Sequence, residues 1–277
     1  MSEFHIEHNT RPDVVFTILE GAHNGDMERV VSETGKSPAT INRMLPMLRK
    51  LGVLVAGKGF ALTPLGEGIF ALRGESASFF AEAMHILLYT THSLDPSVRF
   101  SWAYRQVVDS LWHSTDRVLD SAARAQFVES VLIGAAREFR VSSEQVAFSS
   151  ESVNGALNWL RALEPAVLSS VGKSERFHRR YFCRPFSFLW SVDYLYRATG
   201  TSPGVRLFLS QERVENLCKI CLLDPEGFEN VLFMCKRTSD YERGGLFHYG
   251  TEGGFGRWVL LARPCQVPKL PGVPVDS

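Results

Sequence analysis

Cys218 and Cys221 form a C-x-x-C spacing, which many zinc sites use. A structural zinc site needs four ligands, but no second pair follows, and Cys235 is the only other thiol nearby. The pair also lies inside an apolar helical pattern, LCKICLL. We therefore predict buried, free cysteines and no bound metal.

The histidines and glycines provide no better enzymatic site. His85 and His92 are seven residues apart and share one face of a predicted helix, but they lack an evident ligand partner. Six glycines between Gly244 and Gly256 could hold a phosphate, yet no helix clearly follows them, which favours a hairpin tip. The P-loop, the zinc-protease His-Glu-x-x-His and the nucleophile elbow are absent. We predict no catalytic residue, no enzyme activity and no cofactor.

Residues 34–66 have the composition needed to recognise nucleic acid. Between Glu33 and Glu67 the sequence holds five basic residues and no acidic residue, which suits a polyphosphate. Asparagine and arginine form paired hydrogen bonds with adenine and guanine, so some of these side chains are expected to contact bases and others phosphates. The predicted DNA-binding residues here are Lys36, Ser37, Thr40, Asn42, Arg43, Lys50 and Lys58.

A helix and a hairpin are predicted to position these side chains. Ser37 is a suitable N-cap, Pro38 fits the first helical position, and apolar residues recur at helical spacing up to Gly52. Two short apolar runs then flank the turn Gly57-Lys58-Gly59, which predicts a β-hairpin wing. Pro46 removes one hydrogen bond inside the helix, so we expect a kink there or a shorter helix.

Residues 142–184 repeat this pattern at an offset of 112 positions. Aligning 149–163 with 37–51 gives six identities in fifteen positions. Helical periodicity explains the shared leucines, but not the asparagine and arginine matches, Asn42 with Asn154 and Arg49 with Arg161. A basic, aromatic stretch follows and predicts a second wing along a phosphate backbone, although a solvated hairpin explains it equally well. The predicted DNA-binding residues here are Asn154, Lys173, Arg176, Arg179 and Arg180.

The predicted fold is mainly α with small β-wings. It comprises a winged-helix domain (1–73), a helical linker or dimerisation region (74–140), a second winged-helix-like unit (141–185) and a small α+β region with a loose proline-rich tail (186–277). Thirty basic residues balance thirty acidic ones, so any affinity for nucleic acid must come from local patches. No apolar run reaches membrane-spanning length, no signal peptide is evident, and the five cysteines do not resemble a disulfide framework. We expect a cytoplasmic protein.

Residues 11–72 resemble the winged-helix domains of bacterial transcriptional regulators, and TPLGEGIFAL resembles the exit from the wing into the next helix in those proteins. The wider layout, with its aromatic YLYRATG-type helix and mixed tail, resembles an uncharacterised prokaryotic family encoded beside phage-defence and DNA-modification genes. The resemblance implies a DNA-binding regulatory or accessory role. It carries over no catalytic residue.

We therefore expect a protein that binds double-stranded DNA and forms a homodimer, with defence-system proteins as possible further partners. Two alternatives remain open. One is a scaffold whose winged helices bind other proteins. The other is a repressor that holds a small molecule among Trp102, Trp112 and neighbouring aromatic residues.

Overall fold

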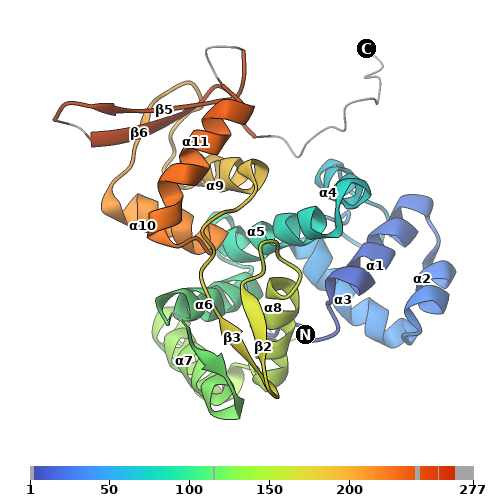
Figure 1. Ribbon diagram of the computed structural model, residues 1–277. Coiled ribbons are helices and arrows are strands. Elements are labelled where there is room, and N and C mark those ends of the chain that lie inside the picture. Colours follow the sequence, from blue (N-terminus) through green and yellow to red (C-terminus); the bar gives the residue numbers. More distant parts are fainter. Residues whose placement is uncertain (1–2, 115, 241–243, 255, 266–277) are drawn as a thin grey trace.

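The computed structural model describes residues 3–114, 116–240, 244–254 and 256–265. These residues form a mainly helical structure with two small three-stranded antiparallel sheets, so the predicted fold class is confirmed at this coarse level. Figure 1 shows three groups of elements around α5 (Ala77–Leu94). Among the described residues, no helix is long and apolar enough to cross a membrane.

The first group consists of four helices and a hairpin, with bounds α1 (Pro12–Asn24), α2 (Met27–Thr34), α3 (Pro38–Lys50) and α4 (Pro64–Glu75). The side chains of Asp26, Ser37 and Thr63 cap α2, α3 and α4 by accepting backbone N–H groups of the first turn. The predicted hairpin lies between α3 and α4, where Leu54 pairs with Leu62. Local capping and turn signals therefore define this group.

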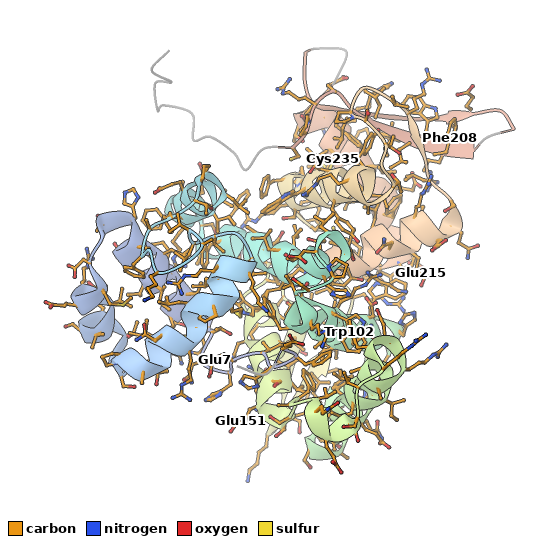
Figure 2. The ribbon with its side chains drawn as sticks, turned by 180° about the vertical axis from the view of Figure 1, so that it is seen from behind. Glu7, Trp102, Glu151, Phe208, Glu215 and Cys235 are labelled. Atoms are coloured by element: carbon orange, nitrogen blue, oxygen red, sulfur yellow. The ribbon has the colours of Figure 1, made fainter. Side chains whose placement is uncertain are left out.

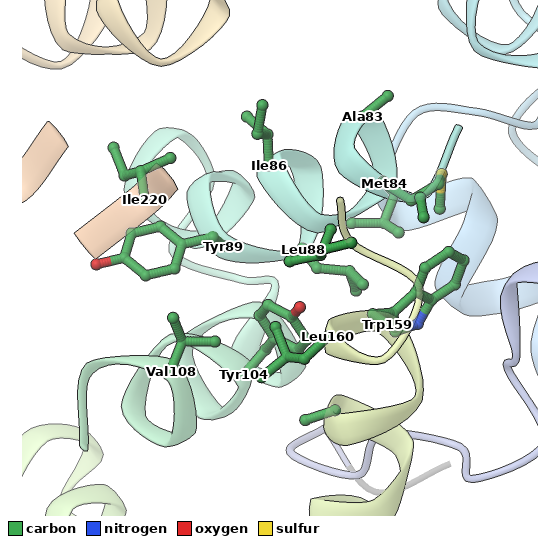
Figure 3. Close-up of a cluster of buried hydrophobic side chains, with 14 of the residues drawn as sticks. Ala83, Met84, Ile86, Leu88, Tyr89, Tyr104, Val108, Trp159, Leu160 and Ile220 are labelled. Atoms are coloured by element: carbon green, nitrogen blue, oxygen red, sulfur yellow. The ribbon is translucent and has the colours of Figure 1, made fainter. Parts of the chain in front are cut away.

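Helix α5 forms the centre of the molecule and contacts α4 as well as helices of both other groups. Figure 3 shows its buried side chains packing against Tyr104 and Val108 of α6 (Arg99–His113), Trp159, and Ile220. Nearly all of the helix from Phe80 to Thr90 is buried. The region interpreted as a linker thus contributes the main core of the structure.

The second group follows α6 and ends in a sheet with strand order β1-β3-β2. Its elements are β1 (Val118–Leu119), α7 (Ser121–Phe139), the 3-10 turn η1 (Ser143–Gln145), α8 (Ser150–Leu160), β2 (Leu168–Val171) and β3 (Ser174–Phe177). The predicted helical region ends at Arg140. Strand β1 lies before that boundary and pairs with β3, which lies after it. The sheet therefore joins residues from both sides of that predicted boundary.

The third group contains three helices and the second sheet, with strand order β4-β6-β5. Its elements are α9 (Pro185–Ala198), β4 (Leu207–Phe208), α10 (Gln211–Cys221), η2 (Pro225–Gly227), α11 (Phe228–Thr238), β5 (Phe247–Glu252) and β6 (Gly256–Leu261). Four of the six glycines, from Gly250 to Gly256, lie in the β5–β6 hairpin, as the sequence indicated, whereas Gly244 and Gly245 precede β5. Most of the predicted proline-rich tail, 266–277, lies outside the described residues.

Residues 3–10, interpreted from sequence as a lead-in, are part of the core, and we call them the N-terminal segment. Phe4, Ile6 and Thr10 are buried. The Phe4 ring packs edge-on against Trp102 and Phe139, with ring centroids 5.9 and 5.2 Å away. The segment connects the first group to the second.

Candidate nucleic-acid interface

Helix α3 buries one face and exposes the other. Its core face consists of the apolar residues Ile41, Met44, Leu45, Met47 and Leu48. Asn42, Arg43 and Lys50 are exposed on the other side. The helix continues through Pro46, so a shortened helix is not observed. Pro46 is half-buried one turn after the exposed Asn42, and it leaves the Asn42 carbonyl without its usual helical donor.

The hairpin after α3 places one more base beside this face. Lys58 is exposed at the turn, where Gly57 has a φ of 80°, a conformation that favours glycine. Arg49 Nη2 donates to the carbonyl of Gly59 at 3.1 Å and so ties the end of α3 to the turn. Arg49 thus has a structural partner, while Lys58 has none among the described residues.

The turn before α3 holds the remaining predicted residues. Ser37 caps the helix and its hydroxyl lies 3.0 Å from Thr40 Oγ1. Lys36 Nζ donates to Asn9 Oδ1 at 2.9 Å, which ties the N-terminal segment to this turn. The exposed cations of the candidate interface are therefore Arg43, Lys50 and Lys58. Hydrogen bonds from Ser97 and the charge of Lys50 lower the pKa of Asp95, so an acidic group from outside the stretch lies near Lys50.

Helix α8, the predicted equivalent of α3, differs strongly in its surroundings. Its outward strip is narrow, and the charged groups there lie beside polar neighbours. Arg161, just after the helix, forms a two-pronged ion pair with Glu175 at 2.6 and 2.7 Å, and Glu151 lies 3.8 Å from His8. Asn154 is only partly exposed, and its Oδ1 is buried. The assignment of Asn154 as a DNA contact is therefore wrong for this arrangement.

The N-terminal segment lies directly on α8. His5 Nδ1 is 2.8 Å from Ser152 Oγ, and Asn158 Nδ2 donates to the carbonyl of His8 at 3.0 Å. A Cβ placed on Gly155 would lie 2.9 Å from Ile6 Cγ2, so glycine permits this close approach. Figure 2 shows Glu7 of the segment near Glu151 at the start of α8. Part of the α8 surface is thus already used for a contact within the chain.

The hairpin after α8 leaves two predicted residues accessible. Lys173 lies in the β2–β3 turn, where Gly172 has a φ of 59°, and Arg176 is exposed on β3. Strand register places Arg176 opposite Ser169. This hairpin matches the predicted position of the second turn.

Arg180 is not a phosphate contact, because it is buried and only 4% exposed. Its Nη1 lies 2.7 Å from Glu82 Oε1 and 3.1 Å from the carbonyl of Glu164, and its Nε donates to the carbonyl of Cys221 at 2.8 Å. Burial lowers the pKa of Arg180, but the Glu82 carboxylate together with Cys183 and Cys221 outweighs burial, so the pKa is raised overall. The guanidinium is therefore a charged part of the core.

Arg179 also has a structural role. It lies past the end of β3, with its guanidinium 4.0 Å from the centre of the Trp112 ring. Its Nε donates to the carbonyl of Trp112 at 2.8 Å, and its Nη1 lies 3.6 Å from Asp224. The predicted wing contact by Arg179 is wrong, since its charge is already neutralised and stacked.

The residues first considered for catalysis lie in the core. Cys218 and Cys221 are buried on α10, as predicted, and among the described residues no group of three or more His, Cys, Asp or Glu side chains could hold a metal. Burial lowers the pKa of His85 to about 3. Its Nε2 faces the carbonyl of Ile220 at 2.8 Å and its Nδ1 faces Tyr104 Oη at 2.7 Å. His85 is therefore a neutral core histidine.

The aromatic residues proposed to hold a small molecule are also packed. Trp102 donates to Glu138 at 2.7 Å and Trp112 to the carbonyl of Leu223 at 2.8 Å, and both are almost completely buried. A ligand at that place would need these contacts to open. The predicted ligand position is therefore filled by protein side chains in this structure.

No protein-family model, curated protein or solved structure matches this chain. The geometry of α3, its hairpin and the surrounding charges is therefore the basis for proposing a function.

Proposed function

We propose that the chain binds double-stranded DNA through α3 and the hairpin of residues 53–63, as a winged helix-turn-helix. The observation that carries the proposal is the exposed face shared by Asn42, Arg43, Lys50 and Lys58, which holds three cations and belongs to a stretch without any acid. A helix of this width fits the major groove, and a basic hairpin beside it fits the adjacent backbone. The proposed role is that of a prokaryotic regulator or defence accessory protein.

We propose a second winged helix in the group from α6 to β3. Its order of helix, strand, two helices and hairpin, with β1 pairing to β3, supports this relation. In this unit α8 is engaged by the N-terminal segment, which leaves Lys173 and Arg176 as the accessible bases among its predicted DNA contacts. It therefore contributes at most phosphate contacts from its hairpin. Its contact with a peptide segment also favours protein binding as the second candidate function for this unit.

Fluorescence anisotropy of a labelled random duplex over a salt series tests the proposal. Each neutralised phosphate changes the slope of log affinity against log salt by about 0.9. Lys58→Ala should flatten that slope by about one unit, and Arg137→Ala, which removes an exposed charge from α7, should leave it unchanged. Equal effects of the two substitutions, or no salt-dependent binding, would contradict the proposal.

Arg43→Ala tests base recognition separately. On a preferred site selected from random duplex, it should weaken binding by about 1–3 kcal/mol, the value of one paired base contact. On random duplex the loss should be smaller, since only part of that contact forms. An equal loss on both duplexes would assign Arg43 to a phosphate.

A further inference from the structure

A cavity of about 800 Å³ lies where the end of α4 and the start of α5 meet α9, the end of α11 and neighbouring loop residues. Its size is within the range of small-molecule sites, roughly 300–1,000 Å³. The site contains none of the residues discussed above as DNA contacts. The sequence offered no signal for it, because its walls come from segments between Leu72 and Cys265.

The walls are mainly aromatic and aliphatic. Phe79, Phe182 and Phe186 contribute rings, and Leu189 and Leu246 contribute aliphatic surface. Aromatic faces attract cations through their quadrupole, and this structure contains one such contact at the cavity, where the Arg184 guanidinium lies 4.5 Å from the centre of the Phe79 ring. A ligand must therefore be largely apolar, and a positive charge is compatible with the rings.

The charges at the cavity are not balanced. Arg184 Nη2 lies 3.2 Å from Glu164 Oε2 and 2.9 Å from Ser78 Oγ, so its charge already has a partner. Glu75, the last residue of α4, is exposed and lines the cavity, and it forms no ion pair with any described residue. The lining therefore keeps one uncompensated negative charge.

We propose that this cavity binds a small hydrophobic cation, such as an aromatic amine or a quaternary ammonium or phosphonium compound. The apolar walls bury the body of the ligand, and the aromatic rings together with Glu75 favour its charge. An anion of the same size would meet the Glu75 carboxylate, and the cation of the lining, Arg184, already pairs with Glu164 through Nη2, although its Nε has no partner among the described residues. This assignment does not depend on DNA binding.

The cavity shares α4 with the proposed DNA interface. The last turn of α4 contributes Leu72 and Glu75, and its first turn supports the hairpin, since Thr63 Oγ1 donates to the carbonyl of Gly52 at 2.5 Å. Gly66 lies so close to Val53 that an added Cβ would be 2.0 Å from its carbonyl oxygen. A ligand that shifts α4 is thus placed to change DNA affinity, a consequence that rests on the proposed function and is measured separately.

Rhodamine 6G, a fluorescent hydrophobic cation, tests the site by direct titration of the full chain. We expect saturable binding of one molecule per chain. Glu75→Gln should weaken it about fivefold, since one nearby charge is lost at a partly solvated position. Glu67→Gln is the matched control, because it removes a carboxylate from the same helix about 12 Å away. It should leave the affinity unchanged.

Leu246→Trp, which fills the cavity, should weaken binding at least tenfold. Absence of saturable binding, equal effects at Glu75 and Glu67, or an unaffected Leu246→Trp variant would overturn the site. Equal affinity for the anionic dye anilinonaphthalene sulfonate in competition would overturn the assigned charge class. These measurements contain no DNA, so their failure is distinct from failure of the proposed DNA interface.

Discussion

Replacing Arg180 separates the buried role found here from the phosphate contact that the sequence predicted. The side chains of Arg180 and Glu82 are 2% and 1% exposed, and their charged atoms are 2.7 Å apart. Removing one member of a buried ion pair leaves an uncompensated charge and costs about 3–5 kcal/mol. Arg180→Met should therefore lower the free energy of unfolding by about that amount.

Urea denaturation followed by circular dichroism measures this change. Arg176→Met is the matched control, because Arg176 is an exposed base four residues earlier, and it should change stability by less than about 0.5 kcal/mol. The double variant Arg180→Met, Glu82→Gln should recover part of the loss, since no charge then stays buried. If the single variant does not fold, the double variant still tests this recovery.

One result would refute the reasoning. If Arg180→Met unfolds with the stability of the unchanged chain and instead flattens the salt dependence of DNA binding, Arg180 must be at the surface. The basic stretch would then be a wing, as the sequence alone predicted, and the assignment of Arg180 to the core would fall.

Two further predictions concern packing and pH. Gly155→Ala should destabilise the protein by about 1–3 kcal/mol through overpacking against Ile6, whereas Gly74→Ala in open space on α4 should be neutral or slightly stabilising in the same urea experiment. The pKa of His85 falls from 6.5 to about 3 on folding, so the unfolded state binds the extra proton. The contribution of His85 to the free energy of unfolding should be fully present above pH 6.5. Below that pH the free energy of unfolding should fall by up to about 1.4 kcal/mol per pH unit. His85→Gln should reduce that slope between pH 6.5 and 4.5, and His113→Gln at the surface should not; equal slopes would place His85 in contact with water.

Local signals were sufficient for the first group of elements. The cap at Ser37, the helical spacing up to Leu48 and the glycine turn before Phe60 all act within a few residues of their own position, so sequence alone located helix and hairpin. Pro46 was a local signal too, since it removes one hydrogen bond of the helix, but the helix nevertheless continues to Lys50.

Long-range partners could not be read in the same way. Lys58 and Arg180 are both bases in basic stretches, but Glu82, which is 98 residues away in the sequence, places Arg180 in the core. The N-terminal segment had no recognisable pattern, and its role depends on the small size of Gly155, far along the chain. The cavity likewise requires five separate segments to meet. Burial by distant residues thus decides which of the predicted bases are available.

Helical periodicity did not explain two matches of the internal repeat, Arg49 with Arg161 and Asn42 with Asn154. The structure shows what each residue contacts. Arg49 and Arg161 both tie the end of a helix to the hairpin that follows it, Arg49 through the carbonyl of Gly59 and Arg161 through the carboxylate of Glu175. Arg49 and Arg161 therefore have the same structural role, which is to hold a helix and its hairpin together. The match between them does not indicate a shared contact with DNA. The difference in partner matters for function.

A carbonyl accepts the Arg49 hydrogen bond without adding a negative charge, so the α3 surface stays cationic. Glu175 gives the second unit a stronger tie but cancels the charge of Arg161. The asparagine match shows the same difference between the two units, since Asn42 on α3 is exposed and Asn154 on α8 is only partly exposed. The two helix-and-hairpin units thus differ in their surfaces, because the cations of the proposed DNA interface stay exposed while the α8 surface is used to hold the chain together.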